Sequence, residues 1–275
     1  MSGSRSYRIV AHAVLAAGAV AMAFPFLWMF LTSVKSFPET VTVPVTVLPR
    51  TWRFENYREV FHKLPYVRLY ANTLLFMFWR VVCAVLSGVT AGYVFGRIRF
   101  PGKGVLFFLI LSQMMVPSEV YTIPQYLMLA GLGALNTIFA LVFPGLISCF
   151  GVFLMRQFYM GVAGEFEEAA FMEGANDFQI LTRIMFPIAK APLTSLGVIA
   201  ALGAYKNLMW PLIVNMHMEK MTLTSALATF QTAYFVNYPY LMTGAMLAVW
   251  PVLVLYLFFQ KPLIRGVQLN SGIKL

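Results

Sequence analysis

Charged residues are scarce in this chain, and acidic residues are the scarcest. Only 11% of its 275 residues are charged and only ten are acidic, whereas a soluble domain carries about 25% charged residues. Hydrophobic residues make up 60% of the chain. This composition argues against a soluble globular domain and favours a membrane protein.

Cysteine and histidine are also rare. Cys83 and Cys149 lie inside apolar runs and form no CxxC pair, so we expect no disulfide framework. His12, His62 and His217 are scattered along the chain, which argues against a metal site. The net charge of +10 is not concentrated in a dense basic patch, and basic residues that flank membrane spans explain it more simply than nucleic acid binding does.

The chain lacks a motif for ATP hydrolysis. The nearest match to a phosphate-binding loop is GRIRFPGKG, but Gly96 is one residue too far from Gly102 and Gly104 stands where Ser or Thr binds magnesium. No combination of Ser, His and Asp or of Cys and His suggests a nucleophilic enzyme. We therefore expect a protein that is not an enzyme and that carries no cofactor of its own.

Long apolar runs are what the chain has instead. Six of them reach the length of about 20 mainly apolar residues that a membrane-spanning helix needs. We predict an all-α, polytopic membrane protein in which residues 1–275 form a single transmembrane domain without internal repeats. The third span is interrupted by Pro117 and Pro124. The six predicted spans are 9–34, 69–96, 105–127, 135–155, 193–214 and 240–259.

The first run has some features of a secretory signal peptide. Arg5 and Arg8 precede it, and the Ala-Met-Ala at 21–23 resembles a cleavage site. However, the apolar run continues through Phe24–Leu31, which is too long for an ordinary signal peptide. We therefore predict a membrane anchor.

The basic residues predict an orientation in the membrane. The loop at 97–103 carries three of them, whereas the AGLGA connection between the third and fourth spans carries none. Positive loops are retained in the cytoplasm, so we expect both termini and the segment 156–191 to be cytoplasmic. The loop 35–68 then lies outside, although it is basic, and its stretch RFENYREVFHKL has apolar residues at helical spacing. Such spacing is typical of an amphipathic helix at the membrane surface.

Half of the acidic residues fall in one stretch, EFEEAAFMEGANDF, at residues 165–178. The part from 164 to 172 is rich in helix formers, and Gly174 supplies a turn. Asn176 followed by Gln179 fits the capping box of a second helix. The sequence therefore predicts a cytoplasmic elbow of two helices joined by a turn.

The second helix of the elbow is expected to end near Pro187 and Pro192. The elbow is either a solvated loop or a docking site for a soluble partner. Apolar residues rimmed by charge often mark interfaces, and small side chains let a partner approach closely. These observations favour docking. The apolar residues are Phe166, Phe171, Met172 and Phe178, and the small ones are Ala169 and Ala170.

The spacing of EAA, a glycine, an isoleucine and a proline across 168–187 resembles the EAA loop of bacterial ABC importer permeases. Glu173 stands where that family usually has Asp, and Phe186 where it usually has Leu. Four further stretches, GRIRFPGK, LNTIFALVFP, FGVFLMRQFY and MWPLI, look like the carbohydrate-type permeases, and the chain is similar to the smaller maltose-type permease subunit. The resemblance covers nearly the whole chain.

This resemblance implies the type I ABC importer permease fold, with a cytoplasmic coupling loop at 160–190 whose residues 164–174 sit in a cleft of an ATPase subunit. It also implies four partners: a second, homologous permease, two ATPase subunits that carry ATP and magnesium, and an extracytoplasmic solute-binding protein. The expected location is the inner membrane of a bacterial or archaeal cell. The implied coupling residues are Glu168, Ala169, Ala170, Phe171, Met172, Glu173, Gly174 and Ala175.

Polar residues inside the predicted spans are candidates for the solute path, because charge within a bilayer is costly. Three interpretations of Arg80, Glu119 and Lys206 are open. They form an electrostatic funnel for an anionic or zwitterionic solute, the two basic side chains reach the outer interface, or Glu119 pairs with one of the basic residues. Amides and aromatic faces suit hydroxyl-rich ligands, although they also serve helix packing and interfacial anchoring. The candidates are Asn72, Arg80, Gln113, Glu119, Tyr205, Lys206, Asn207 and Trp210.

We therefore expect a permease subunit of an ATP-driven importer that forms half of the path for a carbohydrate or carbohydrate-derived solute. Tyr205-Lys206-Asn207 stands where carbohydrate permeases usually have Trp-Asn-Asp, which leaves open an anionic solute such as glycerol phosphate, a glycerophosphodiester or uronate. A secondary transporter is a more distant alternative. Inverted repeats would favour it, and the sequence shows none.

Overall fold

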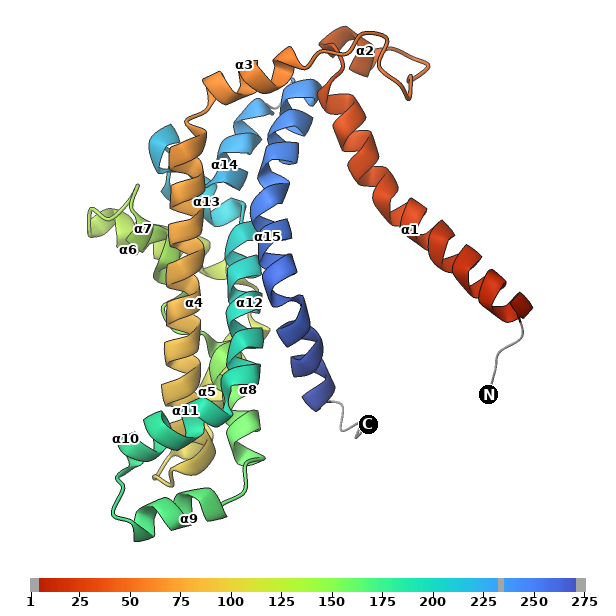
Figure 1. Ribbon diagram of the computed structural model, residues 1–275. Helices are drawn as coiled ribbons and strands as arrows, with labels where there is room; N and C mark the ends of the chain where they lie inside the picture. Colours follow the sequence, from red (N-terminus) through yellow and green to blue (C-terminus); the bar gives the residue numbers. More distant parts are fainter. Residues whose placement is uncertain (1–4, 232–234, 271–275) are drawn as a thin grey trace. The chain divides into compact units, whose positions relative to one another are not determined.

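The computed structural model describes residues 5–231 and 235–270 (Figure 1), and this part of the chain confirms the all-α prediction. Within it the only strand-like feature is an isolated bridge between Gln231 and Val236. The chain divides into two compact units, Met1–Tyr66 with Ala226–Pro251 and Val67–Ser225 with Val252–Leu275. The assignment of the whole chain to one transmembrane domain stays a prediction.

Three continuous helices in the described part are long and apolar enough to cross a membrane, and three bent pairs of helices raise the number to six if each pair is one span. The first, second and sixth predicted spans are the continuous ones, and the third and fourth overlap bent pairs. The fifth overlaps only the second part of the bent pair Asp177–Ile188 with Lys190–Lys206. The continuous helices are α1 (Arg5–Ser33), α4 (Tyr66–Arg97) and α15 (Tyr238–Asn270).

The third predicted span departs most from a straight helix. It consists of α5 (Lys103–Met115), the short η1 (Ser118–Tyr121) and α6 (Thr122–Gly131), and the two parts are bent by 98°. The break lies at Pro117, because the residue before a proline avoids the helical region, and Val116 is extended. Pro124 lies inside the first turn of α6, where a proline is tolerated.

The fourth span is bent by 47° because each of its helical parts has its own N-cap. The side chain of Thr137 accepts a hydrogen bond from the backbone N–H of Ala140 at 3.1 Å, and Ser148 accepts one from Gly151 at 3.0 Å. Such caps satisfy N–H groups that a new helix leaves unpaired. The parts are α7 (Ile138–Val142), η2 (Phe143–Gly145) and α8 (Cys149–Met160).

The fifth span is shifted towards the N-terminus relative to the prediction. Its helix, α12, runs from Lys190 to Lys206, and the residues up to Val214 form a separate short helix, α13 (Met209–Val214). Lys206 is therefore the last residue of a helix and does not lie in its middle, and its depth in the membrane stays a prediction. Pro192 lies in the first turn of α12 and does not end the elbow.

A stripe of glycines on α4 brings α4 and α8 into close contact. Gly88, Gly92 and Gly96 recur every four residues and so share one face of the helix. A Cβ atom at Gly92 would lie 2.6 Å from the Cβ of Met155, and one at Gly96 would lie 3.2 Å from the Cβ of Tyr159. Met155 and Tyr159 are fully buried. Small residues of this kind allow membrane helices to approach closely.

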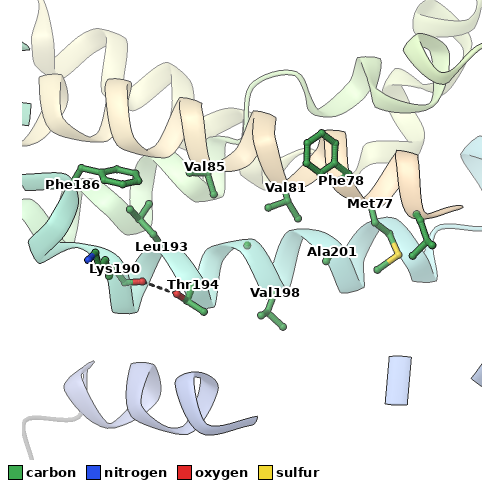
Figure 2. Close-up of a pocket in the computed structure, with 12 residues that line it drawn as sticks. Met77, Phe78, Val81, Val85, Phe186, Lys190, Leu193, Thr194, Val198 and Ala201 are labelled. Carbon is green, nitrogen blue, oxygen red and sulfur yellow. Dashed lines mark hydrogen bonds between the residues drawn. The ribbon is translucent and has the colours of Figure 1, made fainter. Parts of the chain in front are cut away.

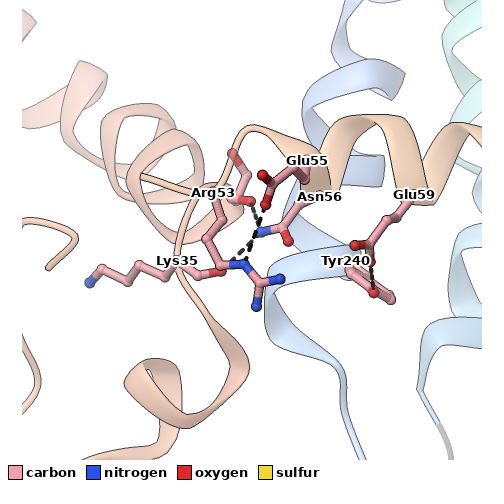
Figure 3. Close-up of polar contacts among 7 residues, drawn as sticks. Lys35, Arg53, Glu55, Asn56, Glu59 and Tyr240 are labelled. Atoms are coloured by element: carbon pink, nitrogen blue, oxygen red, sulfur yellow. Dashed lines mark hydrogen bonds and ion pairs between the residues drawn. The ribbon is translucent and has the colours of Figure 1, made fainter. Parts of the chain in front are cut away.

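In the first unit, the end of α1 is held by α3, which in turn contacts the first turn of α15 (Figure 3). The side-chain amide of Asn56 donates hydrogen bonds to the carbonyl oxygens of Ser33 and Lys35 at 2.8 and 2.9 Å. The hydroxyl of Tyr240 donates a hydrogen bond to Glu59. The remaining elements are α2 (Phe37–Val41), α3 (Glu55–Lys63), η4 (Met218–Lys220), α14 (Leu223–Leu227) and η5 (Ala228–Phe230).

The predicted amphipathic helix exists as α3, but its apolar residues do not share one buried face. Val60 and Leu64 are buried, whereas Phe54 and Phe61 are each more than half exposed. Polar Asn56 is buried instead, because it satisfies two backbone carbonyls at the end of α1. The placement of α3 at the outer membrane surface stays a prediction.

Candidate functional site

The acidic stretch forms the predicted elbow at one end of the second unit, beyond the ends of α4 and α8 (Figure 1). Gly174 has φ +82°, a conformation that favours glycine. Asn176 and Gln179 form the capping box, with both hydrogen bonds at 2.9 Å. The elbow consists of α9 (Glu165–Met172), α10 (Asp177–Ile180), the π-helical η3 (Leu181–Met185) and α11 (Phe186–Ile188).

The inner face of α9 packs against the rest of the second unit. Ala170 is buried in a cluster with Met155, Tyr159, Ile180 and Met185. Its carbonyl oxygen also accepts a hydrogen bond from the N–H of Ala175 at 2.9 Å, which closes the turn. Of the two alanines in the EAA motif, this one therefore serves the fold.

The outer face of α9 is unpartnered within the described chain. Glu165, Glu168, Ala169 and Met172 are spaced as one helical stripe, and all four side chains are exposed, Met172 by 89%. We call this set the outer stripe. Phe166 and Phe171, on its two edges, are each more than half exposed. Phe178, at the start of the second helix, is 72% exposed.

An ion pair fixes the first turn of α9 to the end of α4. Nε of Arg97 lies 3.0 Å from a carboxylate oxygen of Glu167, and both side chains are only 16% exposed. The Nη2 atom of the same arginine donates hydrogen bonds to the carbonyl oxygens of Val162 and Ala163 at 2.8 and 3.3 Å. The sequence does not single out Glu167, because three of the four residues at 165–168 are glutamates and nothing in the pattern shows which one turns inward.

Two candidates for the solute path have their polar atoms engaged by the protein backbone. The side-chain amide of Asn72 donates hydrogen bonds to the carbonyl oxygens of Glu219 and Met221 at 2.8 and 2.9 Å. The indole N–H of Trp210 donates one to the carbonyl oxygen of Ala140 at 2.9 Å. Both side chains thus join distant segments of the second unit.

Tyr205 and Asn207 lie at the end of α12. Tyr205 is buried in a cluster with Phe76, Ala204 and Trp210. Asn207 is the C-cap residue of α12, and its side-chain oxygen accepts a hydrogen bond from the N–H of Trp210 at 3.3 Å. Asn207 therefore links α12 to α13.

Arg80 lies in the middle of α4, with its guanidinium against Gly145. The Arg80 side chain is half-buried, and it forms no ion pair within the described residues. Its side chain thus extends towards η2.

The other three path candidates are exposed. Gln113 lies near the end of α5, Glu119 lies in η1, and Lys206 is the last residue of α12. Within residues 5–231 and 235–270, Glu119 forms no ion pair with Arg80 or Lys206, and its carboxylate accepts a hydrogen bond from Ser118 at 3.3 Å. The structure thus does not bring the three predicted intramembrane charges together.

A groove between α4 and α12 was not anticipated from the sequence. Figure 2 shows side chains of both helices lining it, and its volume is about 570 Å³. Its walls are apolar, with Val81 on α4 and Leu193 on α12, and the exposed Lys190 lies at one end. In a sequence such apolar residues look the same as those that face lipid, so no signal marks the groove.

The comparisons with known proteins agree with this architecture. Residues 88–268 match the family described as "Binding-protein-dependent transport system inner membrane component". The chain is 30% identical over 254 residues to the arabinooligosaccharides transport system permease protein AraQ of Bacillus subtilis, covering 91% of this chain and 90% of AraQ. It is 27% identical over 276 residues to the diacetylchitobiose uptake system permease protein NgcG of Streptomyces coelicolor, covering 97% and 89%.

A solved structure is similar over nearly the whole chain. It is a crystal structure of a bacterial ABC transporter involved in the import of the acidic polysaccharide alginate, with a TM-score of 0.78 and 26% identity, covering 95% of this chain and 99% of the other. The bent spans and the elbow are thus set in the same fold as an ABC importer subunit. The chain therefore belongs to the family of inner-membrane components of binding-protein-dependent transport systems, and it is a multi-pass permease subunit of an ABC importer.

Proposed function

We propose that this permease forms half of the translocation path for a carbohydrate or carbohydrate-derived solute. The names of two relatives support this solute class, since AraQ belongs to an arabinooligosaccharide system and NgcG to a diacetylchitobiose system. The related solved transporter imports a polysaccharide. As a permease component the chain is not itself an enzyme. The energy comes from hydrolysis of ATP, which binds with magnesium to separate ATPase subunits.

The observation that carries the mechanism is the division of α9 into two faces. The inner face is fixed to the permease by Ala170 and Glu167, and the outer stripe has no partner within the described chain. Exposed apolar side chains rimmed by charge are typical of a protein interface. We infer that the outer stripe docks in a cleft of an ATPase subunit, with Glu168 and Ala169 at its centre and Phe166 and Phe171 at its edges.

The docked assembly then comprises this chain, a second homologous permease, two ATPase subunits and an extracytoplasmic solute-binding protein. The elbow and both termini face the cytoplasm. When the ATPase subunits close around ATP, each elbow moves with the subunit that holds it, and the two permeases change from an inward to an outward opening. ATP can shift the permeases between these two states only because the ATPase subunits bind it more tightly in the closed state.

The solute path uses polar side chains that the fold leaves available. Gln113, Glu119 and Lys206 are exposed, and Arg80 is half-buried on α4 with no ion pair in the described part of the chain. Asn72 and Trp210 act instead through the backbone carbonyls that they bind. We therefore assign solute contact to the first four residues before the other candidates.

The turn at Gly174 offers a sharp test of the coupling role. Proline at this position cannot adopt φ +82°, because its ring fixes φ near −65°, whereas asparagine tolerates the left-handed region. Both variants are purified with the partner permease and the ATPase subunits and placed in lipid vesicles. Solute uptake is then measured together with ATP hydrolysis in the presence of the loaded binding protein.

Gly174→Pro is expected to lower uptake and the stimulation of ATP hydrolysis by about tenfold or more, as loss of a typical coupling free energy would. Gly174→Asn should keep both near the wild-type level. If Gly174→Pro assembles and its ATP hydrolysis still responds to the binding protein, the elbow is not the coupling element.

A further inference from the structure

Only one of the three glutamates at the start of α9 faces the permease. Glu165 and Glu168 are exposed, whereas Glu167 is 16% exposed and lies 3.0 Å from Arg97 at the last turn of α4. We propose that Arg97 and Glu167 are positioning residues that pass the movement of the docked α9 directly to α4. This inference rests on the proposed docking of α9 to an ATPase subunit.

One guanidinium holds both the linker that precedes α9 and the first turn of α9. Its Nη2 donates hydrogen bonds to the carbonyl oxygens of Val162 and Ala163 in the linker. Its Nε lies 3.0 Å from a carboxylate oxygen of Glu167 in an ion pair without hydrogen-bond geometry. Arginine suits this role because its planar fork presents several donors in fixed directions. The linker and the helix therefore move together relative to α4 only if this contact breaks.

The carboxylate of Glu167 depends on α4 for its stabilisation. Its other oxygen, Oε1, is buried and has no hydrogen bond among the described residues. Tyr93, one turn before Arg97 on α4, also interacts with this carboxylate. A buried carboxylate that loses its positive partner is strongly destabilised, so the ion pair resists separation when α9 is pulled.

The receiving helix is coupled tightly to its neighbour. The glycine stripe holds α4 against α8, and Nε of Arg156 on α8 donates a hydrogen bond to the carbonyl oxygen of Phe95 on α4 at 3.0 Å. The guanidinium of Arg156 also lies over the ring of Phe107 of α5, 4.1 Å from its centroid. A displacement of α9 thus reaches three helices through α4, in addition to the covalent route along α8.

A second Arg–Glu pair of the same unit supplies a matched control. Arg68, in the first turn of α4, pairs with Glu219, and both side chains are more than 60% exposed. Exposed pairs contribute little, and this one lies at the opposite end of α4 from Arg97. Removing the charges of Arg68 and Glu219 therefore replaces the same two residue types as removing those of Arg97 and Glu167, but leaves the contacts of α9 unchanged.

The test uses the double variant Arg97→Met with Glu167→Gln, because removing both charges leaves no uncompensated buried ion. It is compared with wild type, with the single variants and with Arg68→Met plus Glu219→Gln. Each permease is purified with its partner permease and ATPase subunits and reconstituted in vesicles. Retention of the ATPase subunits, basal ATP hydrolysis and solute uptake per ATP are measured at saturating binding protein.

The double variant at the end of α4 is expected to retain its ATPase subunits and its basal hydrolysis but to lose about tenfold in uptake per ATP, as removal of one coupling contact would. The control pair should keep the wild-type ratio. A wild-type ratio in the double variant would overturn the proposal, as would failure of the double variant to assemble, because the pair would then be merely structural.

Failure of the proposed function has a different signature. If the wild-type ATPase subunits remain bound and coupled when the outer stripe is altered by Glu168→Arg with Met172→Glu, α9 is not the docking helix, and the proposal falls with it. If that change releases the ATPase subunits while the double variant couples normally, the docking stands and only the positioning role is wrong.

Discussion

Gly92 of α4 lies against Met155 of α8 so closely that a Cβ at position 92 would come within 2.6 Å of the Met155 Cβ and 3.1 Å of the backbone nitrogen of Arg156. One of these atoms is attached directly to the backbone and the other belongs to it, so neither moves aside easily. The helices therefore meet at a distance that only glycine allows, and the elbow that follows α8 is attached to this rigid pair.

Gly92→Ala should destabilise the permease by about 1–3 kcal/mol, the usual cost of overpacking a close contact. Gly203→Ala is the matched control, because a Cβ at Gly203 in α12 meets nothing within 4 Å. Thermal unfolding of the purified complex measures both. Equal unfolding temperatures for Gly92→Ala and Gly203→Ala would show that α4 and α8 can move apart without loss of stability.

Trp210→Phe should lower stability more than it alters solute recognition. The substitution removes the donor of a buried hydrogen bond to the carbonyl oxygen of Ala140, and an unsatisfied buried acceptor costs about 1–3 kcal/mol. We expect a lower unfolding temperature with the apparent affinity for solute in the uptake assay unchanged. A weaker solute affinity at normal stability would instead place Trp210 in the path.

If the solute is anionic, Arg80→Met should reduce its uptake and make uptake less sensitive to salt, because the positive charge attracts an anion over a range that salt screens. Basal ATP hydrolysis of the assembled complex should change little. Lys206→Met should have the smaller effect, since Lys206 is exposed at the end of α12. Replacing Glu119 as well should restore nothing, because neither basic residue pairs with it. Recovery of a defective Arg80→Met protein on removal of Glu119 would contradict this.

The topology is open to single-cysteine labelling on a Cys83→Ala, Cys149→Ala background. Glu55→Cys, at a side chain that is 75% exposed, should react with a membrane-impermeant maleimide from outside intact cells. Phe178→Cys, at an exposed side chain of the elbow, should react only after the membrane is opened. Labelling of position 178 in intact cells would reverse the orientation.

The sequence predicted the elbow well because its signals are local. The turn needs a residue that tolerates positive φ, and Gly174 is that residue; the capping box needs an Asn and a Gln three positions apart. Both were confirmed. The continuous spans at α1, α4 and α15 were equally accessible, because their length and hydropathy depend on no distant contact.

The remaining features depend on contacts between distant segments. Nothing local distinguishes Glu167 from Glu165, and only the position of Arg97 shows which carboxylate turns inward. The end of α12 at Lys206 follows from Asn207, which caps the helix with an extended backbone and binds the N–H of Trp210. Hydropathy alone extends that span to residue 214, because α13 is as apolar as the helix before it.

The claim that the outer stripe of α9 contacts an ATPase subunit is tested most directly by cross-linking from Met172, whose side chain is 89% exposed. A benzophenone maleimide is attached to Met172→Cys on the background without native cysteines, and the assembled complex is irradiated. Leu132→Cys, also well exposed but in the connection between the third and fourth spans, is the control. Our account predicts a product with the combined mass of the permease and an ATPase subunit from position 172 and none from position 132. A coupled, active complex that gives no such product from position 172 would contradict it.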